Sequence, residues 1–193
     1  MLLVDDRNFY QRYEIIGGKK IMAPAAPLNH SAILMRLGMS IGYYVVKNNC
    51  GRVFLDDVDV HLPDGNLFSP DLVVITSENF GIMSGQGAIY GVPDMVVEVL
   101  SRSTRKNDVT VKKDSYEACG VKEYWIIDPW AKFVDVYILR DGKYYLDGEY
   151  HKFDDDELRE LTEEEKSEIK TEIKLSIFED CMVQVEDIFA WML

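Results

Sequence analysis

The sequence predicts a mixed α/β fold, with a central mixed sheet flanked by helices and an N-terminal β-hairpin. Two patterns lead to this prediction. Short apolar runs of strand length alternate with turn residues through most of the chain, and two longer segments have apolar residues at helical spacing. With 193 residues, of which 47% are hydrophobic, the chain is expected to form one domain, residues 1–193, around a buried core.

The first third of the chain predicts a hairpin, a helix and a strand. The stretch QRYEIIGGKKIMAP contains two strand-like runs joined by Gly17–Gly18, which predicts a β-hairpin. Apolar residues at helical spacing follow Asn29, a residue type that caps helices, and this helix is expected to end near Cys50–Gly51. The alternating stretch RVFLDDVDVHL, residues 52–62, predicts one strand with an apolar and a polar face. The polar face carries Asp57, Asp59 and His61.

Further strands and a second helix are expected in the middle of the chain. The run 67–76 predicts a strand, and the four glycines of residues 77–92 predict a loop. The run 94–101 predicts another strand, and a helix from about Asn107 to Cys119 is stopped by Gly120.

The C-terminal part predicts three more strands in KEYWIID, FVDVYIL and KYYLDG, in which Tyr124 and Trp125 are expected to be core residues. The segment 154–172, called the acidic segment below, is expected to be a solvated surface helix or an insertion. The tail, which ends in an apolar run, is expected to pack back on the core.

The charge of the chain is unevenly distributed. A net charge of −13 argues against a nucleic-acid partner, since such partners favour a basic surface. The acidic segment, however, carries ten acidic and three basic residues, whereas residues 101–122 carry six basic and three acidic ones. A locally positive segment therefore follows Glu98, which leaves nucleic acid open as a partner.

Cysteine usage and hydropathy indicate the compartment. Cys50, Cys119 and Cys181 are too few and too scattered for a disulfide framework or a zinc site. No apolar run reaches the length of a signal peptide or a membrane span. We therefore expect a cytoplasmic protein with no membrane partner.

Two predicted strands each carry a carboxylate within an apolar run. Asp71 lies in SPDLVVI and Glu98 lies in PDMVVEVL. Buried carboxylates are costly unless they are paired or bind a metal, and Mg²⁺ commonly takes only one or two of them. If the strands are neighbours, the two acids can share one cation; alternatively, either acid points to solvent or caps a loop. Asp94 is ~13 Å from Glu98 along the same strand and is expected to satisfy local backbone donors instead.

The second helix repeats polar residues at every fourth position, so Asp108, Lys112 and Tyr116 share one face. One interpretation is a surface ion pair beside an aromatic ring. The other is that Lys112 delivers its charge to the acids at the strand ends, where it orients water and offsets charge on a phosphate. Lys113 points about 100° away around the helix, so only one of the two lysines can do this, and the sequence leaves open which one.

Other candidate sites are weaker. The polar face of residues 57–61 is typical of a half-exposed strand, and His30, His61 and His151 have no metal-ligand spacing. Nucleophilic serine, phosphate-loop and dinucleotide-binding motifs are absent from the sequence.

Several motifs in order resemble the Uma-two family of restriction endonucleases, part of the PD-(D/E)XK nuclease superfamily. They are YEIIGG, PLNHSAILMRL, SPDLVVI, VPDMVVEVLSRST, DVTVKKDSYEACGVKEYWIIDP and SIFEDCMVQVEDIFAWM. The most specific part is PDMVVEVLS followed by DxxxKxxxYxxxGVxEYWxxDP. The resemblance implies a restriction-endonuclease-like core, a Mg²⁺ site in which Mn²⁺ can substitute, and DNA as substrate.

Carried over by position, the resemblance implies specific roles. Asp71 and Glu98 become metal ligands, with a backbone carbonyl near Val99 as the third, Lys112 becomes the catalytic lysine, and Glu14 becomes an auxiliary acid. His30 falls on a recurrent position without an assigned role. The basic residues expected to contact the DNA backbone are Arg102, Arg105 and Lys106.

The sequence departs from the family pattern at two positions. The superfamily's usual E-x-K spacing puts lysine at position 100, where this chain has Leu100, so the lysine must come from the helix. Lys19 stands where many relatives have a second glutamate. The leading hypothesis is a metal-dependent DNA endonuclease, with a homodimer expected by analogy; the alternative is an inactive module that binds DNA or a protein. A third option is an RNA-directed or toxin-like nuclease.

Overall fold

The computed structural model describes residues 12–22, 26–56, 58–85 and 87–190, and it has the mixed α/β architecture that the sequence predicts. Its central sheet has six strands in the order β11-β10-β9-β8-β6-β3. β8 and β9 pair in parallel and the other neighbours pair antiparallel, so the sheet is mixed. The strands are β3 (Gly51–Leu55), β6 (Leu72–Thr76), β8 (Met95–Val99), β9 (Glu123–Asp128), β10 (Phe133–Arg140) and β11 (Lys143–His151).

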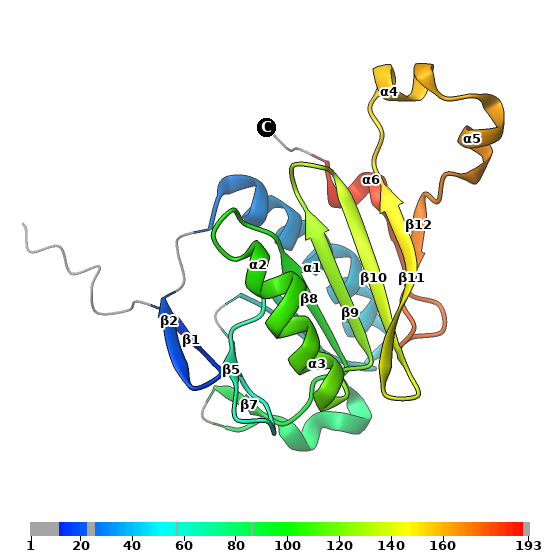
Figure 1. Ribbon diagram of the computed structural model, residues 1–193. Helices are drawn as coiled ribbons and strands as arrows, with labels where there is room; N and C mark the ends of the chain where they lie inside the picture. The colour runs from blue at the N-terminus through cyan, green and yellow to red at the C-terminus, as the bar shows by residue number, and fades with distance from the viewer. Residues whose placement is uncertain (1–11, 23–25, 57, 86, 191–193) are drawn as a thin grey trace, which may run out of the picture.

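A smaller sheet contains the N-terminal hairpin and has the order β2-β1-β5-β4-β7. The predicted hairpin is confirmed, with its turn at Gly17–Gly18. The strands of this sheet are β1 (Tyr13–Ile16), β2 (Lys19–Met22), β4 (Asp59–His61), β5 (Leu67–Phe68) and β7 (Ala88–Tyr90). Figure 1 shows the hairpin projecting at one side of the molecule, next to β5, with which β1 pairs.

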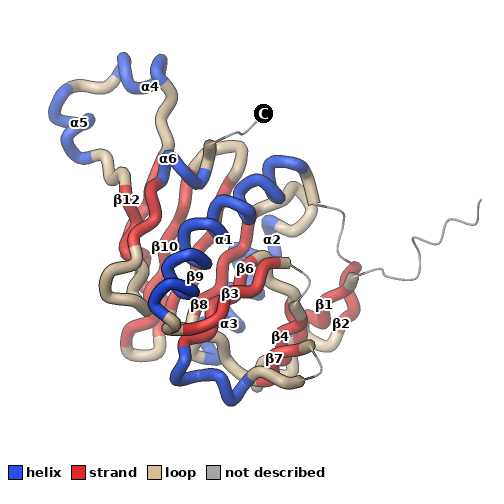
Figure 2. The backbone as a smooth tube through the Cα atoms, turned by 180° about the vertical axis from the view of Figure 1, so that it is seen from behind, coloured by secondary structure: helices blue, strands red, loops and turns tan. Residues whose placement is uncertain are grey.

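Helices cover both faces of the central sheet. α1 (Leu28–Asn48) packs Ile33, Leu37 and Ile41 against one face, which Figure 2 shows from behind. A continuous helical segment made of α2 (Arg105–Asn107), the π-helical turn η3 (Asp108–Lys112) and α3 (Lys113–Cys119) covers the other. Because alternate strand residues point to opposite faces, β6 and β8 contribute apolar side chains to both layers of the core.

Some predicted boundaries are wrong. α1 begins at Leu28 after Pro27, whose fixed φ suits a helix start, and not after Asn29. Residues 52–62 do not form one strand, because β3 and β4 belong to different sheets and Asp56 turns the chain with φ +47°. Asp57, assigned to the polar face of that strand, lies outside the described residues. The predicted loop 77–92 contains a 3₁₀ helix, η2 (Ser77–Ile82), and β7.

The C-terminal third forms the last strands, an arm and a closing segment. The acidic segment contains two short surface helices, α4 (Asp155–Glu160) and α5 (Glu163–Glu168), each with a capping box and no buried residue. Figure 1 shows them as an arm that stands away from the sheet. The tail then forms β12 (Glu172–Lys174), β13 (Met182–Gln184) and α6 (Val185–Ile188), and its part up to residue 190 packs on the core as predicted. Residues 191–193, the end of the predicted apolar run, lie outside the described residues.

One further prediction concerns two aromatic residues. Tyr124 and Trp125 are fully buried in β9, which confirms them as core residues. None of the described helices combines the length and apolar character needed to cross a membrane.

Candidate active site

Asp71 lies immediately before β6 and faces the end of β8. The antiparallel register pairs Leu72 with Val97, which brings the residue before Leu72 opposite the residue after Val97, namely Glu98. The Oδ2 atom of Asp71 accepts a 2.6 Å hydrogen bond from the backbone N–H of Val99, and its Oδ1 lies 2.9 Å from Nε2 of His30. The two strands are therefore neighbours, and Asp71 and Glu98 lie at the same end of this strand pair.

The ammonium group of Lys112 lies among three carboxylates. Its Nζ is 2.8 Å from Oε1 of Glu14, 3.1 Å from Oε1 of Glu98 and 3.1 Å from Oδ1 of Asp108. Only 3% of Lys112 is exposed. The structure thus brings together four residues that come from the hairpin, a central strand and the helix.

The helix face predicted from the four-residue spacing points into this cluster. Asp108, Lys112 and Tyr116 are all buried, and the Tyr116 hydroxyl donates a 3.0 Å hydrogen bond to Oε1 of Glu98. Asp108 and Lys112 lie at the two ends of the π-helical turn, a widened form often found at functional sites. Lys113 points elsewhere, with its Nζ 3.6 Å from the centre of the Tyr137 ring.

Glu14 connects the hairpin to the central sheet. It lies in β1, on the buried side of that strand, and its Oε1 accepts a 3.1 Å hydrogen bond from the backbone N–H of Ser69 as well as contacting Lys112. The sequence alone offered no physical reason for an acid at this position; the signal was the family motif YEIIGG.

The electrostatics of the cluster follow from burial and from the excess of acids. Burial raises the pKa of Glu98 well above its ordinary value; the charge of Lys112 opposes this shift, and Asp108, Asp71 and Glu14 add to it. Burial works against the charged form of Lys112, but the charges of Glu98, Asp108 and Glu14 outweigh it and raise the pKa of the ammonium well above its usual range. Lys112 is therefore protonated at neutral pH.

His30 belongs to the site, although no role was derived for it from the sequence. Burial lowers the pKa of the imidazole, but the hydrogen bond and the charge of Asp71 outweigh burial, so the pKa is raised. Its Nδ1 atom is buried and has no hydrogen-bond partner among the described residues. Its position in the first turn of α1 places it directly over Asp71.

A pocket of about 70 Å³ opens onto these residues. Its lining includes Asp71, Glu98, Val99 and Lys112, and also Arg12, which pairs with Asp56 at 2.6 Å. Arg12 was not singled out from the sequence, because nothing in its local pattern distinguishes it from other surface arginines.

The donor set suits a hydrated cation that needs few protein ligands. Among the described residues, no three His, Cys, Asp or Glu side chains form a ready-made metal cage. Mg²⁺ usually keeps several waters and takes one or two carboxylates, and the pair Asp71 and Glu98 meets that requirement. Oε2 of Glu98 makes no hydrogen bond with any described residue, so this oxygen is open to a ligand. The surplus of acids over lysine in the pocket also favours a divalent cation.

The basic residues predicted to contact DNA follow β8: Arg102 lies on the turn and Arg105 and Lys106 lie in α2. Arg102, Arg105 and Lys106 are exposed. Arg105 also forms an ion pair with Asp128, which lies at the end of β9, so its guanidinium is already held in place. Ser101 and Thr104 from the same turn line the pocket, which puts the three basic residues at its border.

The fold is of the restriction-endonuclease-like type. The structure is similar to that of a protein from Anabaena variabilis ATCC 29413 described as "a putative nuclease belonging to DUF820", with a TM-score of 0.66 and 22% sequence identity. The similarity covers 94% of this chain and 91% of the other. Residues 5–171 match the Uma2 family, described as "Putative restriction endonuclease", and the chain therefore belongs to that family. Curated proteins include no match to this chain.

Proposed function

We propose that this protein is a Mg²⁺-dependent endonuclease that hydrolyses phosphodiester bonds in DNA. The observation that supports this best is the contact of one buried lysine, Lys112, with Glu14, Glu98 and Asp108, beside Asp71. A lysine next to two carboxylates at the ends of neighbouring strands combines the groups needed to hold a cation and to stabilise charge on a phosphate.

In this proposal Asp71 and Glu98 hold the ion, with the backbone carbonyl of Val99 as a third ligand and with Mn²⁺ able to replace Mg²⁺. When bound, the ion polarises the phosphate and lowers the pKa of a coordinated water. Val99 lines the pocket, and its backbone N–H donates a hydrogen bond to Asp71. Because Glu98 directly precedes Val99 in β8, the same stretch of backbone positions both acids.

Lys112 acts as a donor. Because its ammonium is protonated at neutral pH, Lys112 can donate a hydrogen bond to the oxygen of a water molecule and so orient that water. Its positive charge can also offset negative charge on the phosphate, but the ammonium cannot accept a proton. Glu14 and Asp108 contact the ammonium of Lys112, and the hydroxyl of Tyr116 donates a hydrogen bond to Glu98. These contacts hold Lys112 and Glu98 in fixed positions relative to each other. Arg102, Arg105 and Lys106 are proposed to contact the DNA backbone at the border of the pocket.

Two substitutions test this proposal. Glu98→Gln and Lys112→Ala are each expected to abolish Mg²⁺-dependent nicking of supercoiled plasmid DNA. The first substitution removes the negative charge of a proposed metal ligand, and the second removes the ammonium group that is proposed to orient the water. Lys113→Ala is the matched control, since the neighbouring lysine lies over Tyr137 and should leave cleavage unchanged. Circular dichroism checks that all three variants are folded, and addition of EDTA should stop the wild type. Unchanged cleavage by folded Glu98→Gln would contradict the site assignment.

A second function is favoured by one specific observation. Position 100 holds leucine in place of the superfamily's lysine, as expected of an inactive nuclease fold that binds DNA or a protein. Calorimetry separates the two functions: an endonuclease should bind Mg²⁺ or Mn²⁺ in a way that Asp71→Asn weakens. Absence of metal binding together with absence of nicking would favour the binding module.

A further inference from the structure

The hairpin beside the pocket has an exposed outer strand. β2 is the last strand of the smaller sheet, and all four of its residues are exposed. It carries Lys19 and Lys20 between the turn and Ile21–Met22. Exposed edge strands are a liability that charged side chains reduce, so the lysines have one structural explanation already.

The inner strand of the same hairpin is firmly attached to the active-site pocket. Glu14 of β1 contacts Lys112, and Arg12, which precedes β1, pairs with Asp56. At the other end, the N–H of Gly17 donates a 2.8 Å hydrogen bond to Oδ1 of Asn66. Gly17 and Gly18 have φ values of +56° and +77°, as a two-residue turn of this tightness requires.

Asn66 in turn links this turn to the catalytic helix. Its amide donates a 3.1 Å hydrogen bond to the hydroxyl of Ser115, which lies in α3 three residues after Lys112. The hairpin is therefore anchored along its inner strand and at its tip, whereas β2 is open to solvent. A ribbon held in this way presents a fixed surface next to the catalytic lysine.

The surface of the hairpin is basic and partly apolar. Residues 12–22 contain three basic residues and one acid, a net charge of +2 in a chain of net charge −13, and the acid, Glu14, is buried. The Nζ of Lys20 lies 3.8 Å from the centre of the Tyr13 ring. Both views of the backbone place the acidic arm of α4 and α5 on the other side of the molecule from the hairpin (Figures 1 and 2).

A second group of basic residues lies near the pocket. The pocket is lined by Arg12, which precedes β1, by Glu14 of β1, and by Ser101 and Thr104 after β8. Arg102 lies between Ser101 and Thr104, and Arg105 and Lys106 follow in α2. The hairpin and the segment after β8 therefore both bring basic residues near the pocket, although the chain as a whole is acidic.

We propose that the β1–β2 hairpin enters the major groove of duplex DNA, with Lys19 and Lys20 contacting phosphates on either side of it. This inference rests on the proposed nuclease function and names its substrate form as B-form duplex. The major groove of B-DNA, about 12 Å wide, admits a two-stranded ribbon, whereas the narrow, deep groove of duplex RNA does not. Lys19 and Lys20 point to opposite faces of the ribbon, so each can reach the phosphates on one side of the groove; Tyr13 and Met22 are exposed on the face of Lys20, and Ile21 is exposed on the face of Lys19.

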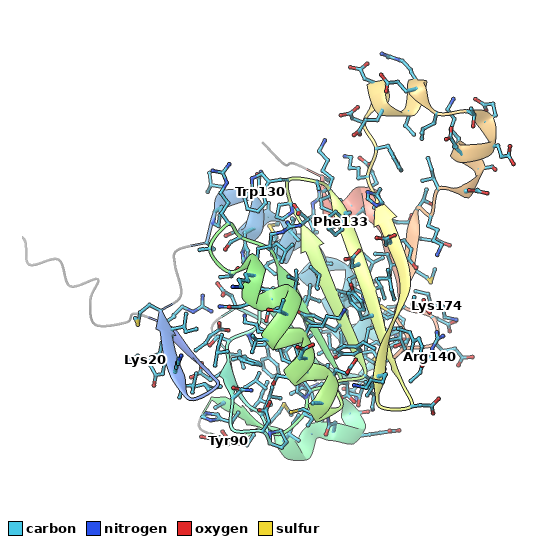
Figure 3. The ribbon with its side chains drawn as sticks, in the orientation of Figure 1. Lys20, Tyr90, Trp130, Phe133, Arg140 and Lys174 are labelled. Carbon is cyan, nitrogen blue, oxygen red and sulfur yellow. The ribbon has the colours of Figure 1, made fainter. Side chains whose placement is uncertain are left out.

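Fluorescence anisotropy with a labelled DNA duplex tests the proposal, measured in the Glu98→Gln background and in Ca²⁺ to prevent cleavage. The double variant Lys19→Gln/Lys20→Gln should make the slope of log K against log salt shallower by about 1.8, since each lost phosphate contact contributes about 0.9. The matched control is Lys170→Gln/Lys174→Gln, which removes the same charge from exposed lysines elsewhere and should leave the slope unchanged. Figure 3 shows Lys20 and Lys174 on opposite edges of the molecule.

The outcomes separate this proposal from the proposed function. If the wild type cleaves DNA and the hairpin variant keeps the parental slope, the hairpin assignment is overturned while the nuclease function stands. Equal binding of duplex DNA and duplex RNA also overturns it, because groove entry predicts a preference for DNA. If the protein neither binds nor cuts DNA at low salt, the proposed function fails and takes this inference with it. An equal change in slope for both double variants indicates a net-charge effect and overturns the assignment to the hairpin.

Discussion

Two Pro-Asp dipeptides precede two neighbouring strands of the central sheet, and their carboxylates have opposite surroundings. Asp71, before β6, lines the pocket, and 16% of its side chain is exposed. Asp94, before β8, is 1% exposed and accepts hydrogen bonds from the backbone N–H and hydroxyl of Thr76 and from the amide of Asn79. Its other oxygen pairs with Lys122 at 2.6 Å.

The direction of the strands explains this difference. β6 and β8 run antiparallel, so their first residues lie at opposite ends of the sheet. Asp71 meets the end of β8, where Glu98 and Val99 lie, and Asp94 meets the end of β6, where Thr76 lies. The aspartate of the first dipeptide, Asp71, therefore lines the candidate active site, whereas that of the second, Asp94, holds β8 and β6 together.

The largest expected effect is the loss of activity when Asp71 is neutralised. Asp71→Asn keeps the shape of the side chain and can still accept the Val99 hydrogen bond, but it removes a ligand charge. We expect cleavage to fall by at least about 100-fold, since even second-shell partners of a bound metal cost 10–100-fold when mutated. Plasmid nicking under saturating Mg²⁺ measures the loss.

Asp94→Asn makes the same change at the other dipeptide and serves as the matched control. Here we expect unchanged cleavage per folded molecule and a loss of about 1–3 kcal/mol in the free energy of unfolding, because a buried hydrogen-bonded charge is removed. Urea denaturation measures the stability. A large loss of activity in a folded Asp94→Asn protein would show that the two dipeptides do not have separate roles.

The smallest expected effect is the pH dependence of the contribution that Asp94 makes to the free energy of unfolding. Burial raises the pKa of Asp94, but its hydrogen bond with Lys122 and those with Thr76 and Asn79 outweigh burial and lower it. A lowered folded-state pKa means that the stabilisation is fully present above the unfolded value, about 3.9, and is lost as pH falls through the folded value. The difference in unfolding free energy between the wild type and Asp94→Asn should therefore shrink when measured at about pH 3 rather than pH 7. A difference that stays constant over this range would contradict the lowered pKa.

Features that depend on near neighbours in the sequence could be predicted. The run Met95–Val99 was recognised as a strand from its apolar residues, and the face shared by Asp108, Lys112 and Tyr116 followed from the four-residue repeat. The exclusion of Asp94 from the pocket followed from the rise of a strand. The prediction that Asp94 binds backbone donors is confirmed, although the donor is Thr76 of the neighbouring strand and not a local group.

Features that depend on contacts distant in sequence could not be predicted. Nothing near Asp56 indicates that the alternating stretch 52–62 divides between two sheets, because each half alone has a normal strand pattern. The contact of Glu14 with Lys112 joins residues 98 positions apart and requires the hairpin to pack beside the helix. His30 was recognised only as a recurrent position, since its partner Asp71 lies on another element.

By itself the sequence determined which residues could carry the chemistry: two acids within apolar runs and a lysine on a helix face with an acid and a tyrosine. Only the tertiary structure decided which of the acids meet. Alternation along a strand is a local property with a period of two, whereas the direction and register of the partner strand are set by packing across the sheet. The antiparallel pairing of β6 with β8 brings Asp71 opposite Glu98 and leaves Asp94 at the far end, bound to Thr76.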